Sequence, residues 1–534
     1  MSASVVIRTY ERREMLAPAV LSALGQTLSP REVIVVDDGS RDGTAAWLAG
    51  RFAGEPRLRV IRSERNQGAA WAANAGLAAA QGDTIAFLDS DDHWHPRFLE
   101  LSLALLAAEP SASASYADYA QVWPEQALRR EVRLPYPEDQ RRAWLVNPFV
   151  PCLSLMLFRR DFLQRLGGFD PRWRIVHDQA LLGRAVLAAA NPFRHLPLPL
   201  AVRRLHGGNL IADSDAWRSE QLALVEELFA RAEAGDLAAL RPAAVQAVER
   251  RVAGLAEQRR RFAAPPQRSV SVVLPTRNRR ALLERAIASV DAQSQRPLEI
   301  IVVDDGSTDG TPEWLASLSR PDLRSIAGDR PRGVGHARNL GWRASRGEII
   351  AMLDDDDEWL PDYLAAVQVG FAALPEPLFV FTDCFDYRAG EPPLHVVHEG
   401  GQLYPDLVTR MLYKAFPHCS SVFALTRARL EAVGGYDESL PACEDSDLYL
   451  RLAASAGTAM PIQVERPLAM RLLHRSMADE NTMIRATLRH HAMMLTKFFA
   501  SAASAPYRTL AADVRRSTAD SISRRLRPEA PARD

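Results

Sequence analysis

Short apolar runs alternate along the chain with longer segments whose apolar residues recur at helical spacing. In the first two hundred residues or so, the runs that predict buried strands lie near 4–8, 32–36, 58–61, 84–88 and 112–117. Helical spacing covers segments near 12–26, 44–53, 68–81 and 97–108. The same alternation begins again from residue 270. It predicts α/β domains in which helices cover both faces of a mainly parallel sheet.

The two halves of the chain repeat one another. Val36-Asp-Asp-Gly-Ser-Arg-Asp-Gly-Thr44 recurs as Val303-Asp-Asp-Gly-Ser-Thr-Asp-Gly-Thr311, an offset of 304 − 37 = 267 residues. Gly167-Gly-Phe-Asp170 recurs as Gly434-Gly-Tyr-Asp437, again with an offset of 437 − 170 = 267. A near-constant offset over so long a stretch indicates two copies of one domain, because solenoid repeats have much shorter periods.

Segments with helical character follow each copy. We expect a first domain at 1–211, a helical linker at 212–268, a second domain at 269–477, and a helical segment with a disordered tail at 478–534. The longest apolar stretch, 143–158, is interrupted by Asn147, Pro148 and Pro151, and we expect a buried strand with its entry loop there. No run of 18 apolar residues occurs, so no membrane-spanning helix is predicted.

The composition excludes some classes of function. The 534 residues carry a formal net charge of −1, which argues against a nucleic-acid partner bound broadly through its phosphates. The four cysteines lack CxxC spacing, so neither a zinc ribbon nor a redox pair is predicted. Because the N-terminus also lacks the pattern of a signal peptide, we expect a cytoplasmic protein.

Clusters of carboxylates follow an apolar run in each copy. They read Asp89-Ser-Asp-Asp92 and Asp354-Asp-Asp-Asp357. The carboxyl ends of parallel strands form the edge where α/β sheets bind ligands. Like charges this close repel one another, and a cation among them relieves the repulsion. A solvated turn that caps the next helix is the alternative, but two copies in matching contexts favour a cation site.

The repeated Val-Asp-Asp-Gly-Ser segment ends the second predicted strand of each copy. Asp38 and Asp305 can accept hydrogen bonds from a base or ribose, because an ionised carboxylate only accepts. A strand-to-helix turn without a ligand is the alternative. Further along, Arg338 at the start of a helix can pair with a diphosphate or stack on a base, whereas the first copy has Ala73 at this position.

A third acidic group, Glu444, Asp445 and Asp447, starts an amphipathic helix. One of its carboxylates can serve as a general base, and plain helix capping is the alternative. The first copy keeps Asp178 but has His177 and Ala180 beside it. In each copy a histidine, His206 or His474, follows an arginine at the end of a strand-like run. This histidine can be a metal ligand, a contact to a diphosphate, or a structural residue.

Together these motifs resemble the family 2 glycosyltransferases of the GT-A fold. In the second copy the ordered set covers nearly all of 270–474: Pro-Thr-Arg-Asn-Arg (275–279), VDDGSTDGT (303–311), GxxxARNxG (333–341), LDDDDEW (353–359), GGYDE (434–438), EDSDLYLR (444–451) and the Arg/His end (471–474). The first copy resembles the family over about 4–206. It departs from the second at Arg8 for Pro275, Ala73 for Arg338, His177 for Glu444 and Ala180 for Asp447.

The resemblance implies two GT-A domains, Rossmann-like with a mainly parallel sheet, joined by a helical connector and followed by a helical segment. It also implies inverting transfer of a sugar from a nucleotide-diphosphate-sugar donor to a hydroxyl of a glycan, a lipid-linked or a protein acceptor. Polysaccharide or glycoconjugate biosynthesis is the expected setting. Peripheral contact with the inner face of the membrane stays open.

The resemblance further implies a divalent ion, Mn²⁺ or Mg²⁺, at each acidic cluster, and one general base in each domain. The implied bases are Asp445 and Asp178. The implied metal ligands are Asp354, Asp356 and His474 in the second copy, and Asp89, Asp91 and His206 in the first. The implied nucleotide-sugar contacts are Thr276, Asp304, Asp305, Arg338, Asp354, Asp355 and Glu444, and in the first copy Thr9, Asp37, Asp38 and Asp89.

The departures in the first copy leave two hypotheses. Either both copies are catalytic, or only the second is and the first binds a donor or acceptor or acts as a scaffold. A pure carbohydrate-binding module is disfavoured, because it would not need a full set of donor, metal and base positions. A nicotinamide dehydrogenase is excluded because no G-x-G-x-x-G follows the first strand of either copy, and a nucleotidyltransferase phosphate loop fits Thr276–Arg279 poorly.

Overall fold

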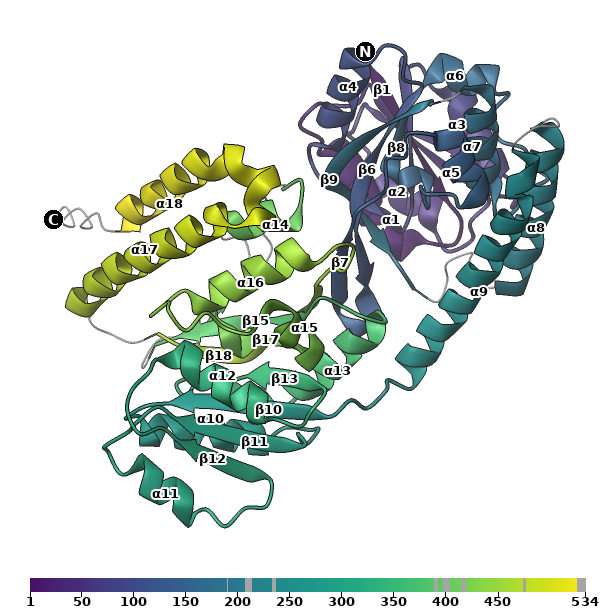
Figure 1. The fold of residues 1–534 in the computed structure, drawn as a ribbon. Coiled ribbons are helices and arrows are strands. Elements are labelled where there is room, and N and C mark those ends of the chain that lie inside the picture. The colour runs from purple at the N-terminus through teal and green to yellow at the C-terminus, as the bar shows by residue number, and fades with distance from the viewer. Residues whose placement is uncertain are drawn as a thin grey trace. The chain divides into compact units, whose positions relative to one another are not determined.

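The computed structural model describes residues 1–189, 191–206, 214–232, 237–388, 392–396, 404–413, 419–473 and 477–525. They form two compact units, the first made by residues 1–126 and 130–260 and the second mainly by residues from 261 onward (Figure 1). We call these units the first and the second domain and describe each by itself. His474 and the tail from residue 526, for which we predicted a ligand role and disorder, lie outside the described residues.

The first domain has a parallel core in the strand order β3-β2-β1-β4, extended by β8, β6, β9 and β5. β8 runs antiparallel to both β4 and β6, whereas β6 and β9 are parallel. The strands are β1 Ala3–Thr9, β2 Glu32–Asp37, β3 Leu58–Arg62, β4 Thr84–Asp89, β5 His93–Trp94, β6 Ala114–Trp123, β7 Leu128–Val132, β8 Met156–Arg159 and β9 Phe193–Arg204. The helices are α1 Arg13–Leu24, α2 Thr44–Arg51, α3 Ala69–Ala79, α4 Phe98–Ala108, α5 Gln140–Val146, α6 Arg160–Arg165, α7 His177–Ala188, α8 Ser214–Arg231 and α9 Arg241–Ala263.

The second domain repeats this topology, with a parallel core β12-β11-β10-β13 extended by β17, β15, β18 and β14. Its strands are β10 Val270–Thr276, β11 Glu299–Asp304, β12 Leu323–Ala327, β13 Ile349–Met352, β14 Glu358–Trp359, β15 Val380–Tyr387, β16 Leu394–Val396, β17 Phe423–Thr426 and β18 Ile462–Leu472. Its helices are α10 Arg280–Asp291, α11 Thr311–Ser317, α12 Val334–Ala344, α13 Tyr363–Ala373, α14 Leu407–Leu412, α15 Arg427–Val433, α16 Glu444–Ser455, α17 Met477–Ala500 and α18 Ala511–Arg525.

The repeat extends to the register of the strands. Ser4 of β1 lies opposite Glu32 of β2, as Ser271 of β10 lies opposite Glu299 of β11. Every residue of β1, β2, β10 and β11 is buried, so burial along these strands is continuous rather than alternating. Burial on both faces is what a parallel sheet covered by helices requires. The predicted α/β class and the predicted elements of the first domain are therefore confirmed.

The expectation of a buried strand with its entry loop at 143–158 holds for the end of the stretch and was wrong for its beginning. Residues 143–146 form the last turn of α5, whose N-cap Asp139 accepts a hydrogen bond from the backbone N–H of Arg142 at 2.9 Å. A strand forms only from Met156, after a loop and a short 3₁₀ turn. The cap at Asp139 stabilises a helix there, because its carboxylate satisfies an N–H that has no partner within the helix.

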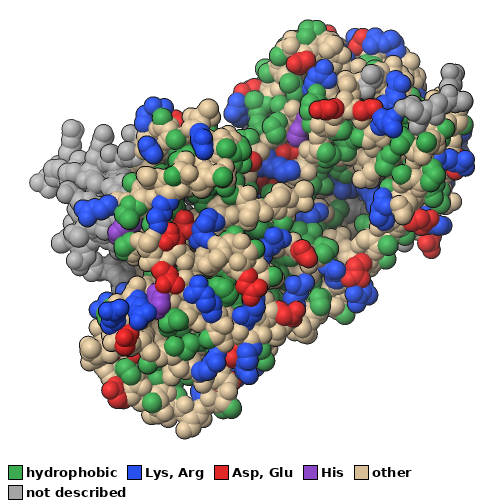
Figure 2. All heavy atoms as spheres, viewed as in Figure 1, with side chains coloured by type: hydrophobic (Ala, Val, Ile, Leu, Met, Phe, Trp, Pro, Cys, Tyr) green, Lys and Arg blue, Asp and Glu red, His purple; other side chains and the backbone are tan. Residues whose placement is uncertain are grey.

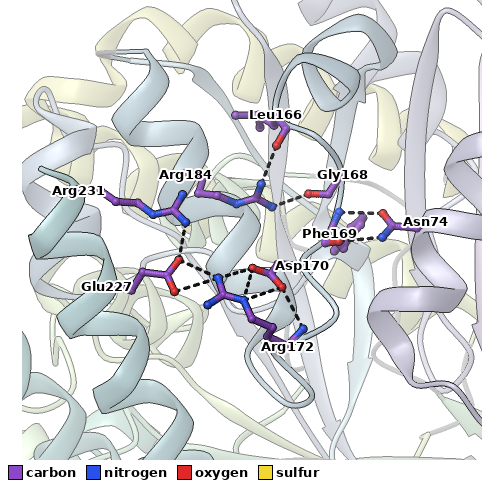
Figure 3. A network of polar contacts seen from close by, with 9 residues as sticks. All are labelled: Asn74, Leu166, Gly168, Phe169, Asp170, Arg172, Arg184, Glu227 and Arg231. Atoms are coloured by element: carbon purple, nitrogen blue, oxygen red, sulfur yellow. Dashed lines mark hydrogen bonds and ion pairs between the residues drawn. The ribbon is translucent and has the colours of Figure 1, made fainter.

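The helices that follow β9 pack onto the first domain. Trp217, Leu224 and Leu228 of α8 share a buried cluster with Val176 and Ala244. Polar contacts fasten α8 as well: Arg172 pairs with Asp170 at 2.6 Å and with Glu227 of α8 at 3.2 Å (Figure 3). In the second domain α17 takes part in the core in the same way, through Met494, Leu495 and Phe498.

None of the helices in the described part of the chain is long and apolar enough to cross a membrane. On the face drawn in Figure 2, basic and acidic side chains are interspersed rather than gathered into large areas of one sign. This distribution agrees with the formal net charge of −1.

Candidate active site

In the second domain, a buried arginine joins the acidic cluster to the third acidic group. Arg338 of α12 donates to Asp354 Oδ1 at 2.5 Å and pairs with Glu444 at the start of α16. Its guanidinium also lies 5.4 Å from the ring centre of Tyr436. Burial alone would lower the pKa of Arg338, but the charges of Asp354 and Glu444 outweigh it and raise the pKa well above its usual value. Three motifs far apart in sequence therefore meet at one cation.

In the first domain a different residue makes the equivalent contacts. Arg8, at the end of β1, pairs with Asp89 and donates to His177 Nε2 at 2.6 Å. Asp89 and His177 stand at the positions of Asp354 and Glu444, whereas Arg8 stands at the position of Pro275. Comparison of the two copies in the sequence indicated that the first lacks the arginine, because Ala73 of α3 stands at the position of Arg338. The structure shows that Arg8 of β1 supplies the guanidinium instead. The substitution of Arg8 for Pro275 was the one sign of this in the sequence.

The two sites differ in charge beside this arginine. His177 is buried, and burial together with the charge of Arg8 lowers its pKa to about 3. His177 is therefore neutral near pH 7, and its Nε2 accepts the hydrogen bond from Arg8. Glu444 at the matching position of the second domain is a carboxylate paired with Arg338. The first site consequently carries one negative charge fewer at this point.

The candidate bases occupy matching places. Asp178 is the second residue of α7, and Asp445 is the second residue of α16. The carboxylate of Asp178 accepts a hydrogen bond from the backbone N–H of Gln179 at 2.8 Å, and that of Asp445 accepts one from Ser446 at 2.6 Å. Neither residue is the N-cap of its helix; those positions belong to Val176 and Cys443. Burial raises the pKa of Asp178 to about 6, and burial with the charge of Glu444 raises that of Asp445 to about 6. Carboxylates with such pKa values suit proton transfer near neutral pH.

The last aspartate of each acidic cluster has a structural role. Asp92 accepts the backbone N–H of Arg204 at 3.0 Å, and Asp357 accepts that of Leu472 at 3.1 Å. Both aspartates are buried. They fix the ends of β9 and β18 against the acidic cluster, and in the first domain this brings His206, which follows β9, next to Asp91.

The remaining carboxylates of the clusters face the ends of β1 and β10. Asp91 pairs with Arg12 at 2.6 Å, as Asp356 does with Arg279 at 2.7 Å. Asp355 accepts from Thr276 Oγ1 at 2.8 Å. In the first domain Ser90 replaces Asp355, and the buried hydroxyl of Thr9 has no hydrogen-bond partner among the described residues.

The aspartates of the Val-Asp-Asp-Gly-Ser turns hold the loops around them. Asp38 accepts the backbone N–H of Gly68 at 2.7 Å, and Asp305 accepts that of Gly333 at 2.8 Å. The preceding residues accept within the turn, Asp37 from the N–H of Ser40 and Asp304 from that of Ser307, both at 2.9 Å. These bonds position the loops that start α3 and α12. They leave lone pairs on each carboxylate for a ligand, since an ionised carboxylate has about four acceptor sites.

The glycine of this turn has a steric reason to be glycine. Gly39 and Gly306 have φ values of +83° and +77°. A Cβ at these positions would lie 2.7 Å from the backbone of Arg65 and 2.9 Å from that of Arg330. The turn and the loop before the helix approach so closely that no side chain fits between them.

Two of the metal ligands predicted for the first domain, Asp91 and His206, lie side by side. Asp91 Oδ2 lies 3.0 Å from His206 Nε2. Two neighbouring ligands of an octahedral ion, each about 2.1 Å from the metal, would be separated by about the same distance. Burial would raise the pKa of Asp91, but the hydrogen bond from His206 and the charge of Arg12 outweigh it, so its pKa is lowered and the carboxylate is ionised.

A second set of ligand atoms lies nearby. Asp89, Asp92 and Cys152 each bring one such atom within 4.8 Å of the others. Burial raises the pKa of both Asp92 and Cys152 well above the usual values, and a protonated thiol is a poor ligand for Mg²⁺ or Mn²⁺. Among the described residues, the structure thus brings Asp89 close to Asp92 and Cys152 and not to both Asp91 and His206, so the predicted ligand set Asp89, Asp91 and His206 stays a prediction.

In the first domain these groups share one cavity of about 550 Å³. Asp38, Asp89, Asp91 and Asp178 all line it, together with Arg8. The cavity thus brings together residues predicted for the nucleoside, the metal and the base, although Asp37 and His206 are not part of its lining. Its wall also includes residues of α8 and α9 that no sequence motif indicated.

Comparison with known proteins agrees with the geometry. The family model described as "Glycosyl transferase family 2" matches residues 4–167 and again 271–434. An uncharacterized glycosyltransferase of Rickettsia conorii is 24% identical over 474 residues, which cover 84% of this chain and 76% of the relative. The O-antigen biosynthesis protein RfbC of Myxococcus xanthus is 25% identical over 507 residues, which cover 89% of this chain and 37% of RfbC.

Among solved structures, Staphylococcus aureus TarS 1–349 in complex with UDP has a TM-score of 0.36 and 19% identity, over 47% of this chain and 72% of that one. The double family match accounts for the duplicated topology and for the GT-A type predicted from the motifs. The chain belongs to glycosyl transferase family 2 and carries two domains of that family in tandem.

Proposed function

We propose that both domains are inverting, metal-dependent centres that transfer a sugar from a nucleotide-diphosphate-sugar donor to an acceptor hydroxyl in polysaccharide or glycoconjugate biosynthesis. The observation that carries this proposal is the cavity of the first domain, whose lining includes Asp38, Asp91 and Asp178 together. The O-antigen role in the name of RfbC supports the biosynthetic setting. We retain a cytoplasmic location as part of the proposal.

In each centre one carboxylate does the proton chemistry. Asp178 or Asp445 takes the proton of the acceptor hydroxyl as the oxygen attacks the anomeric carbon, and the nucleoside diphosphate leaves from the opposite face. A single displacement of this kind inverts the anomeric configuration and needs no covalent nucleophile. Burial keeps the pKa of both bases near 6, so they accept a proton without being permanently protonated at neutral pH.

The acidic clusters hold the leaving group. Asp89, Asp91 and His206 would bind the divalent ion in the first domain, and Asp354 and Asp356 in the second. The ion supplies positive charge that offsets the charge developing on the leaving diphosphate. Arg8 and Arg338 orient the first aspartate of each cluster and tie it to the helix that carries the base.

The direct test is a donor screen with the full chain. UDP-, GDP- and dTDP-linked sugars are supplied with Mn²⁺ or Mg²⁺, and release of the nucleoside diphosphate is monitored with and without a mixture of bacterial glycans. We expect release that depends on the metal and increases with acceptor. Absence of release from every donor, in protein that melts cooperatively, would contradict the proposal.

The raised pKa of the bases predicts the pH dependence. Only the ionised carboxylate accepts a proton, so kcat/KM for transfer should fall about tenfold per pH unit below a pH of about 6 and level off above it. An aspartate with its ordinary pKa would keep activity to a pH of about 4. The profile is measured by diphosphate release under donor-limiting conditions. A profile that is flat from roughly pH 5 to 7 would exclude these aspartates as bases.

The arginine of the first domain decides between one centre and two. In a chain whose second base is inactivated by Asp445→Asn, we expect Arg8→Met to lower the remaining turnover roughly tenfold or more, because Asp89 loses its charged partner. Adding Ala73→Arg should restore part of the activity by placing a guanidinium where the second domain has Arg338. Zero turnover in Asp445→Asn alone would favour the alternative that only the second domain is catalytic.

A further inference from the structure

The cavity of the first domain has a wall that the family motifs do not provide. Trp217 of α8 and Arg251 of α9 line it, together with Arg203 of β9. The guanidinium of Arg251 lies 5.3 Å from the ring centre of Trp217, within the range of a cation–π contact. Trp217 thus supports a guanidinium that belongs to the lining of the cavity.

Within the described part of the chain, the arginines of this wall have no directly bonded partner, although the nearby charges of Asp89 and Asp92 favour the charged form of Arg203. Neither Arg203 nor Arg251 makes a side-chain hydrogen bond or an ion pair with any residue that the structure describes. Arg8 and Arg12, which line the same cavity, pair with aspartates. Burial lowers the pKa of Arg251, so an anion bound beside it would offset the cost of holding its charge there.

Comparison of the two domains shows why Arg203 has no carboxylate partner opposite it in the sheet. Arg471 of the second domain lies opposite Asp386 in the register of β18 and β15, and pairs with both its oxygens at 2.6 and 2.7 Å. Arg203 has the same place in β9, but the residue opposite is Gln121, whose oxygen accepts from Arg130 at 2.7 Å instead. The first domain therefore lacks the directly paired carboxylate that Asp386 supplies to Arg471 in the second domain.

The wall lies at the end of the cavity where the base is. The charges that act on Arg251 include those of Arg203 and Asp178. Gln179, next to the base, is buried, also lines the cavity, and its side-chain oxygen has no hydrogen-bond partner among the described residues. Because the acceptor hydroxyl must meet Asp178, this end is the one that an acceptor would occupy.

The helices that bring these residues are firmly attached. Figure 3 shows Arg172 between Asp170 and Glu227, with Arg231 on the other side of Glu227 at 2.7 Å. Arg184 of α7, the helix of the base, donates to the carbonyl of Leu166 at 2.6 Å. The helices themselves meet in one buried cluster, to which α7 contributes Ala180, α8 contributes Leu228 and α9 contributes Val248, so the wall packs against the helix that carries the base.

We propose that Arg203, Arg251 and Gln179 form an acceptor subsite in the first domain for a sugar that carries an acidic group, either a carboxylate or a phosphate. The subsite rests on the proposed transferase function. It also gives the two domains different acceptor preferences, since the arginine that is available in the first domain is paired with Asp386 in the second.

The test compares probes that differ in one charge. Binding of p-nitrophenyl β-D-glucuronide and p-nitrophenyl β-D-glucoside, and of glucose 6-phosphate and glucose, is measured by calorimetry on the full chain with Mn²⁺ and saturating UDP or GDP. We expect one acidic probe to bind roughly tenfold or more tightly than its neutral partner. Arg251→Met should remove that difference, and Arg251→Lys, which keeps the charge, should retain part of it.

The matched control is Arg250→Met, because Arg250 is the exposed neighbour on the same helix and does not line the cavity. It should leave every affinity unchanged. Equal binding of acidic and neutral probes, or an unchanged difference in Arg251→Met, overturns the subsite. A parallel loss of UDP or GDP affinity in Arg251→Met would assign Arg251 to the donor and also overturn it. If neither nucleotide binds any variant, the proposed transferase function fails, while the paired probes still decide the subsite.

Discussion

Sugar transfer should fall by about 10²- to 10⁴-fold when Asp178 and Asp445 are replaced together by Asn, the range that a positioned general base contributes. Asn keeps the shape and the acceptor oxygen that bonds the neighbouring backbone N–H, but it cannot take the proton of the acceptor hydroxyl. Each single variant should keep the turnover of the other domain. Diphosphate release with saturating donor and acceptor measures all three variants.

A control separates loss of the base from loss of the fold or of donor binding. Asp215→Asn removes an exposed carboxylate on α8 and should leave turnover unchanged. The affinity of the double variant for the nucleoside diphosphate with Mn²⁺ should equal that of the unsubstituted chain, because neither aspartate belongs to the acidic clusters. Normal turnover in the double variant would mean that the proton is accepted elsewhere.

The second large effect is expected from the metal ligands. Replacing Asp91 and Asp356 together by Asn should reduce turnover by at least about a hundredfold, since a metal ion on the leaving diphosphate contributes several kcal/mol. Both carboxylates have an arginine as a neighbour, at 2.6 and 2.7 Å, and Asn can still accept a hydrogen bond from it. The fold should therefore persist, which thermal unfolding checks.

Direct counting of bound Mn²⁺ by electron paramagnetic resonance makes this prediction independent of activity. In the presence of nucleoside diphosphate, the unsubstituted chain should bind two ions, each single variant one, and the double variant none. Asp362→Asn, which removes a half-exposed carboxylate of the second domain, serves as the control. Two bound ions in the Asp91→Asn variant would refute the assignment of the first site.

Much of the fold could be predicted because its determinants are local. Apolar runs such as Val5–Ile7 and Val33–Val36 are buried on both faces of the sheet, so they show up as strands without any knowledge of their neighbours. The stretch at 143–158 was harder to predict, because its apolar content suits a helix or a strand equally and the capping bond at Asp139 decided the outcome.

The candidate site was predictable where its residues end strands. The carboxylates at Asp89 and Asp354 follow directly from β4 and β13, and parallel topology brings such ends to one edge. The different roles of the individual aspartates within each cluster could not be predicted. Asp92 and Asp357 accept hydrogen bonds from backbone N–H groups at the ends of strands more than a hundred residues later in the chain. These contacts become visible only in the folded structure.

By itself, the sequence determined the duplication, the α/β class and the positions of the carboxylates, since these depend on periodicity and on offsets along the chain. Only the tertiary structure decided how the first domain makes up for Ala73, because Arg8 comes from a different element and meets Asp89 and His177 in space alone. The same holds for Arg251 and Trp217, which reach the cavity because α8 and α9 fold back onto the first domain. Contacts between distant elements leave no periodic trace in a sequence, so they become visible only when the chain is folded.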